Sequence, residues 1–157
     1  MRVKEFSKEA LLQNILQEMC YFIATGGGIT FGGGESLLQY EAIKEFCEMK
    51  PAWLNVNIET SLNYTEESVK TLIPYINEWI VDIKTLDHDI YKKYTGKSDR
   101  RMRKNLKILA GEVPQKCKIR IPFIPNYKEN KELLEKEEDT IRNLGFTRIN
   151  VFNYVIR

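Results

Sequence analysis

The chain has 157 residues, 43% of them hydrophobic and 29% charged, and its 24 basic and 22 acidic side chains leave a formal net charge of +2. This composition excludes wholesale disorder and a polycationic nucleic-acid arm, and it provides one hydrophobic core for a single domain over residues 1–157. The apolar runs are far shorter than the about 20 residues that cross a bilayer, and we expect no secretory signal. Neither nucleic acid nor a membrane is therefore an expected partner.

The chain contains three cysteines, Cys20, Cys47 and Cys117. Their odd number and wide spacing indicate neither a disulfide framework nor a CxxC metal site. We interpret them as thiols in a reducing compartment, which predicts a cytoplasmic protein and no metal ligand in this chain.

Helical and strand-like segments alternate along the chain. Apolar spacing predicts a first helix from Ser7 to Met19, and glycines 26–28 and 32–34 flank a short strand at Ile29–Phe31. Further helices are expected over residues 39–49, 65–73, 87–94, 101–110 and 130–144. Further strands are expected over residues 53–59, 79–84, 118–124 and 148–154. Strands that alternate with helices predict a parallel α/β sheet.

The number of strands limits the architecture. Five strands cannot close an eight-stranded TIM-type barrel, so we expect an open, partial β/α barrel. The chain begins with a helix that no strand precedes, and the first strand of such a barrel is therefore expected to be absent.

Polar residues gather at the carboxyl ends of the predicted strands, although strands of parallel sheets are ordinarily apolar. Two of them, Asp82 and Lys84, are two positions apart and so leave the same face of one strand. Any one of these residues alone could face water or form a buried ion pair, but together they predict one polar site at the mouth of the barrel. They are Thr30, Glu59, Asp82, Lys84, Arg120 and Asn153.

The most specific segment is the glycine-rich run from Gly26 to Glu35. It is neither a P-loop nor a dinucleotide fingerprint, because no Gly-Lys-Ser/Thr follows and no strand precedes a GxGxxG pattern. Six glycines around a three-residue strand indicate close approach of the backbone to a ligand, with a flexible surface loop as the alternative. Glu35 and the glycine N–H groups together suit the ammonium and carboxylate of an amino acid moiety.

This run resembles the signature of a known enzyme family. The segment Gly-Gly-Gly-Ile-Thr-Phe-Gly-Gly-Gly-Glu-Ser-Leu-Leu-Gln is similar to that of the radical S-adenosylmethionine enzymes that activate glycyl radical enzymes, typified by the pyruvate formate-lyase activating enzyme. Three further motifs match in the same order: Glu59-Thr60-Ser61, Asp82-Ile83-Lys84 and the run from Ile119 to Pro125. The resemblance covers roughly residues 7–154.

The resemblance implies a set of cofactor-binding residues. Gly33, Gly34 and Glu35 would hold the methionyl amino group of S-adenosylmethionine. Asp82 and Lys84 would lie beside the methionyl carboxylate, and a monovalent cation is a further possibility at this cluster of oxygens. The remaining implied residues are Glu59 and Thr60 on the adjacent strand and Arg120 on the next.

The sequence departs from the family pattern in two places. The family holds a 4Fe-4S cluster in a CxxxCxxC loop after its first strand, and this sequence has no such loop. We therefore expect the cluster ligands to lie in the full-length protein outside this chain, and the chain alone to be inactive. In the last strand Tyr154 matches the family, but Val155 stands where the family has His.

By resemblance, the complete protein would cleave S-adenosylmethionine reductively at the cluster and generate a radical on a glycine of a partner enzyme. The implied partners are that glycyl radical enzyme and an electron donor such as flavodoxin or ferredoxin. One alternative is a non-catalytic S-adenosylmethionine-binding or partner-docking domain. Another is an unrelated barrel enzyme that uses Lys84 as a Schiff-base amine near Asp82.

Two further features are interpreted as surface. The basic run from Lys97 to Lys107 contains no aromatic residues and is expected to be a solvated helix face, with a docking surface for a protein partner as the alternative. His88, the only histidine, is expected to be exposed.

Overall fold

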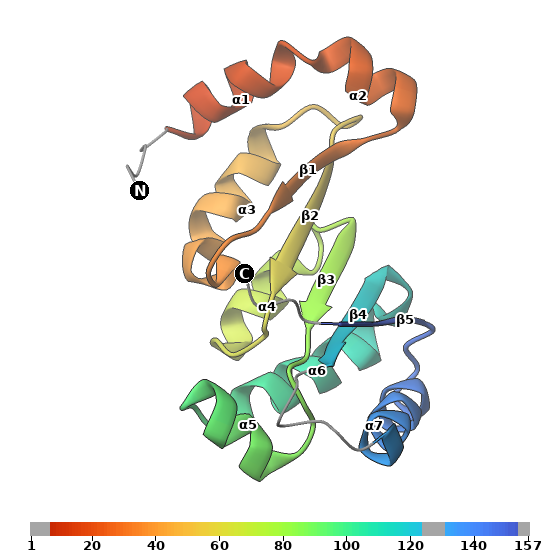
Figure 1. Cartoon of the computed structure of the whole chain (residues 1–157). Helices are drawn as coiled ribbons and strands as arrows, with labels where there is room; N and C mark the ends of the chain where they lie inside the picture. The colour runs from red at the N-terminus through yellow and green to blue at the C-terminus, as the bar shows by residue number, and fades with distance from the viewer. Residues whose placement is uncertain (1–6, 124–130, 154–157) are drawn as a thin grey trace.

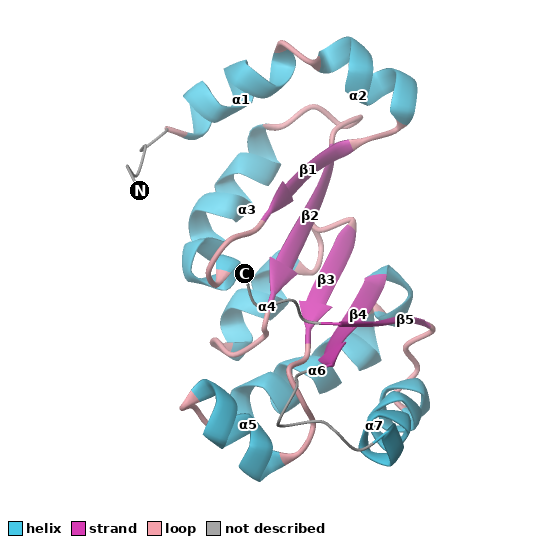
Figure 2. Cartoon of the chain, in the orientation of Figure 1, coloured by secondary structure: helices cyan, strands magenta, loops and turns pink. Residues whose placement is uncertain are grey.

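The computed structural model describes residues 7–123 and 131–153. Its strands form one five-stranded sheet in sequential order, and every neighbouring pair is parallel (Figures 1 and 2). The predicted parallel α/β sheet and open, partial β/α barrel are thereby confirmed. The strands are β1 (Gly28–Phe31), β2 (Asn55–Thr60), β3 (Glu78–Asp82), β4 (Cys117–Phe123) and β5 (Arg148–Asn153).

Helices connect the strands, and several begin at the caps that the sequence contains. The side chains of Ser7, Thr65 and Asp87 each accept a hydrogen bond from a backbone N–H in the first turn of the following helix. The helices are α1 (Lys8–Leu16), α2 (Met19–Thr25), α3 (Tyr40–Met49), α4 (Glu66–Leu72), α5 (His88–Thr95), α6 (Arg100–Glu112) and α7 (Lys131–Asn143), with short 3-10 turns η1 (Ser36–Gln39) and η2 (Pro114–Lys116).

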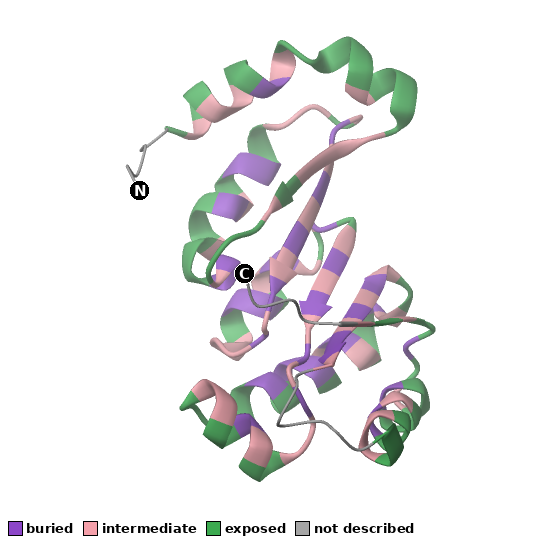
Figure 3. Ribbon diagram, viewed as in Figure 1, coloured by how far each residue is buried: buried purple, intermediate pink, exposed green. Residues whose placement is uncertain are grey.

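The two faces of the sheet differ in burial, as the alternating colours along the strands in Figure 3 show. Along β2, Val56, Ile58 and Thr60 are buried, whereas Asn55, Asn57 and Glu59 are only half-buried. The same alternation runs through β3 and the first part of β4. The buried face joins the apolar core, in which Trp79 is fully enclosed, and we call the half-buried, polar face the inner face.

The predicted bounds of the first helix are wrong. The structure ends α1 at Leu16 and starts a second helix, α2, that continues to Thr25 and stops at Gly26 with φ +63°. Only α1 follows the apolar spacing inward, with Ile15 buried, whereas α2 buries no side chain. The predicted ends of three elements, at Ile124, Asn130 and Tyr154, lie outside the described residues. None of the helices among the described residues has the length and apolar composition of a membrane span.

Candidate functional site

The inner face brings charged side chains together at the carboxyl ends of three strands. Arg120 is paired in register with Asp82. Its guanidinium Nη1 donates to Glu59 Oε1 at 2.6 Å, and its Nε lies 3.3 Å from Asp82 Oδ1. Lys84 Nζ lies 3.7 Å from Asp82 Oδ2. The structure therefore shows the convergence of Glu59, Asp82, Lys84 and Arg120 that the strand pattern predicts.

Asp82 is the least satisfied member of this cluster. Its Oδ1 atom is buried and accepts no hydrogen bond from the described residues, although the Arg120 guanidinium is nearby. Burial raises the pKa of the Asp82 carboxyl above its ordinary value, while Lys84 and Arg120 oppose that rise. A buried oxygen without a donor costs free energy, so this atom is positioned to receive a ligand's donor or cation.

The glycine-rich loop after β1 lies over the cluster. A Cβ on Gly32 would lie 3.2 Å from Glu59 Oε2, so the backbone passes close to that carboxylate. Gly33 and Gly34 have φ of +85° and +60°, a conformation that side chains rarely adopt, and a Cβ on either would meet no described atom within 4 Å. The loop therefore presents bare backbone to open space. Ser36 fixes its end by donating to the Phe31 carbonyl at 3.1 Å.

Glu35 holds this loop to the end of β2. Its Oε1 accepts from the Leu37 N–H at 3.2 Å and from the Thr60 hydroxyl, and its Oε2 accepts from the Ser61 N–H at 3.1 Å and the Ser61 hydroxyl at 2.5 Å. Four donors occupy the acceptor sites of one carboxylate. Ser61 lies within the Glu-Thr-Ser motif but is not among the site residues expected from the sequence.

A cavity of about 280 Å³ lies between the glycine-rich loop and the strand ends. We call it the strand-end cavity; Glu35 and Arg120 stand outside its lining and act on it through Thr60, Ser61, Glu59 and Asp82. Carboxylates, an ammonium group and the exposed backbone of Gly33 and Gly34 in one cavity match the charges of a zwitterionic amino acid moiety. The lining residues are Gly33, Gly34, Glu59, Thr60, Ser61, Asp82 and Lys84.

Ligands for an iron–sulfur cluster are not provided by the described residues, which include every cysteine of the chain. Cys47 and Cys117 are buried, and burial raises their thiol pKa to about 11 and about 12. Cys20 is exposed on α2. No group of three His, Cys, Asp or Glu side chains in the described part could hold a metal ion. A cluster does not fit this part of the molecule.

Two of the sequence expectations concern single side chains: the exposure of His88 and the Schiff-base role of Lys84. His88 is exposed as predicted, but its Nδ1 lies 2.7 Å from Oδ1 of the buried Asp99. Lys84 forms an ion pair with Asp82, and only an unprotonated amine attacks a carbonyl, so this pairing does not favour the Schiff-base alternative.

An open β/α barrel with a polar cavity at the carboxyl ends of its strands defines a class of small-ligand enzymes. The model of the radical SAM superfamily matches residues 2–136 of this chain. The chain belongs to the radical SAM superfamily.

Its relatives include activating enzymes. The chain is 36% identical over 141 residues to the (2S)-3-sulfopropanediol dehydratase activating enzyme of Klebsiella oxytoca, covering 89% of this chain and 44% of that protein. It is 32% identical over 142 residues to the pyruvate formate-lyase-activating enzyme of Clostridium pasteurianum, covering 90% and 59%. The chain thus spans about half the length of these relatives. A domain of a pyruvate-formate lyase-activating enzyme from Bacteroides vulgatus has the same fold, with a TM-score of 0.70 and 22% identity over 82% of this chain and 81% of that one.

Proposed function

We propose that this chain is the S-adenosylmethionine-binding core of an enzyme that activates a glycyl radical enzyme. The strand-end cavity carries this proposal, because it combines the buried, unsatisfied Asp82 Oδ1 with Lys84 and the open backbone of Gly33 and Gly34. The similarity to activating enzymes supports the same function.

Each residue has a part in holding the methionyl end of the cofactor. Gly33 and Gly34 present backbone groups to it, and Glu35 fixes their loop and adds negative charge near its ammonium. Lys84 receives the methionyl carboxylate. The other residues complete the charge balance: Glu59 and Asp82 face the cationic groups or a monovalent cation, Thr60 links Glu35 to β2, and Arg120 positions both carboxylates.

The proposed function also concerns the complete protein, including its cluster, its protein substrate and its electron donor. S-Adenosylmethionine held by these residues would supply the radical chemistry of the complete enzyme, and its target would be a glycine of the protein substrate. The cluster ligands belong to a part of the protein other than this chain, and a flavodoxin- or ferredoxin-like protein donates the electron. A cytoplasmic location accords with three cysteines that form no disulfide.

Direct binding tests the proposal. S-Adenosylmethionine should bind the 157-residue chain with a dissociation constant of about 1 mM or lower in equilibrium dialysis. Replacing Lys84 by Met should weaken binding about tenfold or more, because the methionyl carboxylate loses a charge-assisted hydrogen bond. Lys118→Met is the matched control, since Lys118 lies on the same face of the sheet but outside the cavity lining.

The proposal fails if the chain does not bind the cofactor or if both variants bind it as the original chain does. A second candidate, a non-catalytic S-adenosylmethionine-binding domain, is favoured by the lack of a metal-ligand group in the described residues. Electron paramagnetic resonance of a glycyl radical enzyme treated with the complete, cluster-loaded protein distinguishes the two functions.

A further inference from the structure

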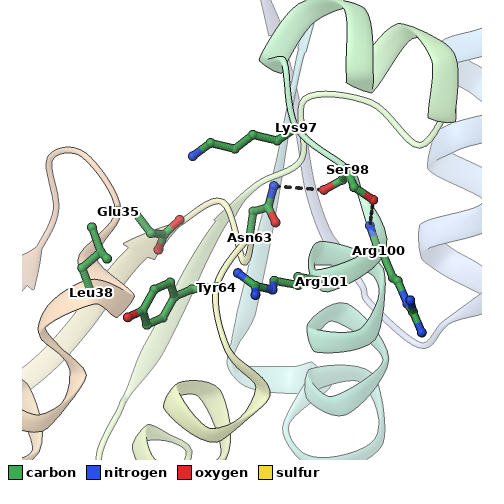
Figure 4. A pocket seen from close by; sticks show the side chains of 8 residues that line it. All are labelled: Glu35, Leu38, Asn63, Tyr64, Lys97, Ser98, Arg100 and Arg101. Carbon is green, nitrogen blue, oxygen red and sulfur yellow. Dashed lines mark hydrogen bonds between the residues drawn. The ribbon is translucent and has the colours of Figure 1, made fainter.

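A second pocket, of about 660 Å³, is larger than the strand-end cavity. Figure 4 shows the side chains that line it. We call it the basic pocket; its lining includes Glu35, Asn63, Tyr64, Lys97 and Arg101. Glu35 links the two pockets, because it lines the basic pocket and its carboxylate accepts hydrogen bonds from Ser61, which lines the strand-end cavity. An occupant of the basic pocket would therefore lie directly beside the proposed cofactor site.

Two exposed cations point into this pocket. In Figure 4 the Lys97 side chain extends toward Glu35 and the Arg101 side chain extends toward Tyr64. Neither forms an ion pair with a carboxylate of the described residues. Other cations of the same basic run are paired: Arg103 with Asp99 at 2.5 Å and Lys104 with Glu66 at 2.8 Å. The basic run thus contains both cations with acidic partners and two cations that face the pocket.

The start of α6 also favours an anion. Its first turn contains no acidic residue and carries Arg100 and Arg101 at the positive end of the helix dipole. The N-cap residue Asp99 makes no capping hydrogen bond, because its carboxylate binds His88 and Arg103 instead. Cations at this end of a helix are unfavourable, because they lie at the positive end of the helix dipole. A bound anion would offset that cost.

The loop that carries Lys97 is held in place. The Lys97 N–H donates to the Thr95 hydroxyl at 3.1 Å, and the Asn63 amide nitrogen donates to the Ser98 carbonyl at 3.2 Å. Asp99 is buried, with 3% of its surface exposed. A fixed loop loses little conformational entropy when a ligand binds, which is the property of a preorganised site.

The other edge of the pocket is apolar. Leu38 from η1 lines it with 57% of its surface exposed, and Tyr64 is half-buried beside it. Nucleic acid would need a wider positive field and stacking aromatics, and the net charge is only +2. Cations facing an apolar edge instead match a peptide that carries carboxylates next to an apolar side chain.

We propose that the basic pocket docks an acidic segment of the protein substrate, with carboxylates at Lys97 and Arg101 and an apolar side chain against Leu38 and Tyr64. This inference rests on the proposed function, because it supplies the surface that brings the substrate chain to the cofactor cavity.

The test compares peptides and charge-matched variants of the full chain. The probes are a short fluorescein-labelled peptide of Asp, Leu and Gly and the same peptide with Asn in place of Asp, measured by fluorescence anisotropy at low salt. The acidic peptide should bind, and the double variant Lys97→Gln, Arg101→Gln should bind it about tenfold or more weakly. The control Lys70→Gln, Lys107→Gln removes the same charge from exposed positions outside the pocket and should change the affinity less than about twofold.

Several outcomes would overturn the docking inference: no binding of the acidic peptide, equal binding of the neutral peptide, or equal weakening in both double variants. Tighter binding of a single-stranded oligonucleotide than of the acidic peptide would assign the pocket to nucleic acid. S-Adenosylmethionine affinity is measured in parallel and should be unchanged in the Lys97, Arg101 variant. If the original chain does not bind S-adenosylmethionine, the proposed function is refuted. If the original chain binds S-adenosylmethionine but the Lys97, Arg101 variant binds the acidic peptide as tightly as the original chain does, the docking inference alone is refuted.

Discussion

Asp82 occupies the inner face between Lys84 and Arg120, and its surroundings affect stability and ligand binding in opposite directions. Its pKa is raised above the ordinary 3.8 because burial outweighs the two neighbouring cations. The folded chain therefore holds the Asp82 proton more tightly than the unfolded chain does. The stability gained from this proton is fully present below about pH 3.8 and is lost as the pH rises through the folded pKa.

Asp82→Asn separates the two effects. At neutral pH the ligand-free variant should melt at the same temperature as the original chain or higher, because it no longer buries an ionised carboxylate with an unsatisfied oxygen. Its S-adenosylmethionine affinity should fall about ten- to hundredfold, as expected for a lost charge-assisted hydrogen bond. Thermal melts and equilibrium dialysis measure the two quantities.

The pH dependence of the melting temperatures of Asp82→Asn and of the original chain provides the control. The melting temperature of Asp82→Asn relative to the original chain should rise as the pH increases from below 3.8 to neutrality. A relative melting temperature that falls over this range would contradict the assigned direction of the pKa shift.

The cysteines should differ sharply in reactivity. Burial raises the pKa of Cys47 to about 11 and that of Cys117 to about 12, whereas Cys20 is exposed on α2. At about pH 8 a disulfide reagent should therefore modify one thiol rapidly in the folded chain and all three after denaturation. Cys20→Ser should abolish this rapid modification. Rapid modification that persists in the variant would show that a buried thiol is accessible to the reagent.

At the scale of elements, the helix predicted over residues 130–144 is α7, a strongly charged helix that buries one of its acids. Glu137 is 3% exposed and accepts from the Leu86 N–H at 2.7 Å and from the Thr85 hydroxyl. This contact fixes α7 to the segment that follows β3 and Lys84. The positions of the cavity residues therefore depend partly on a helix distant in sequence.

Glu137→Ala should destabilise the fold by about 1–3 kcal/mol, because it leaves the Leu86 N–H and the Thr85 hydroxyl without this acceptor. The melting temperature should fall by roughly 2–4 °C for each kcal/mol. Glu135→Ala on the same helix is the matched control, since its side chain is 63% exposed and pairs only with Lys131 among the ion pairs of the described residues. Equal effects of the two substitutions would show that the buried contact contributes nothing.

For the molecule as a whole, the parts of the fold that obey a local period could be predicted from the sequence. The alternation in β2 and the spacing of Asp82 and Lys84 place their side chains on one face, and parallel strands bring that face together with Arg120. Buried charges in polar segments could not be predicted. Asp99 and Glu137 look solvated in the sequence, and their partners are set by how helices pack rather than by neighbouring residues.

The site was predictable to a similar degree. The residues that line the strand-end cavity were mostly named from the motifs, but the four hydrogen bonds of Glu35 were not, because they require the backbone of Ser61 to turn back toward the glycine-rich loop. Likewise the glycines at 26–28 indicated a break in the chain, but nothing in the apolar pattern indicated that α2 continues to Thr25.

The chain of 157 residues should bind no stoichiometric iron–sulfur cluster, because two of its thiols are buried and the third lies on a separate helix. Anaerobic reconstitution followed by iron and sulfide assays measures this. Cys20→Ser should retain the same small amount of adventitious iron. About four irons per chain would contradict this reading of the cysteines.

Because buried and half-buried side chains alternate along β2, selection for folding and selection for ligand binding act on different residues of the same strand. Substitutions at Val56 and Ile58 act on whether the chain folds, whereas substitutions at Asn57 and Glu59 act on what the inner face can hold. The side chains on the inner face can therefore change their chemistry while the buried side chains of the same strand keep the core unchanged. A sheet built in this way can acquire a new ligand or substrate through single substitutions, without passing through an unfolded ancestor.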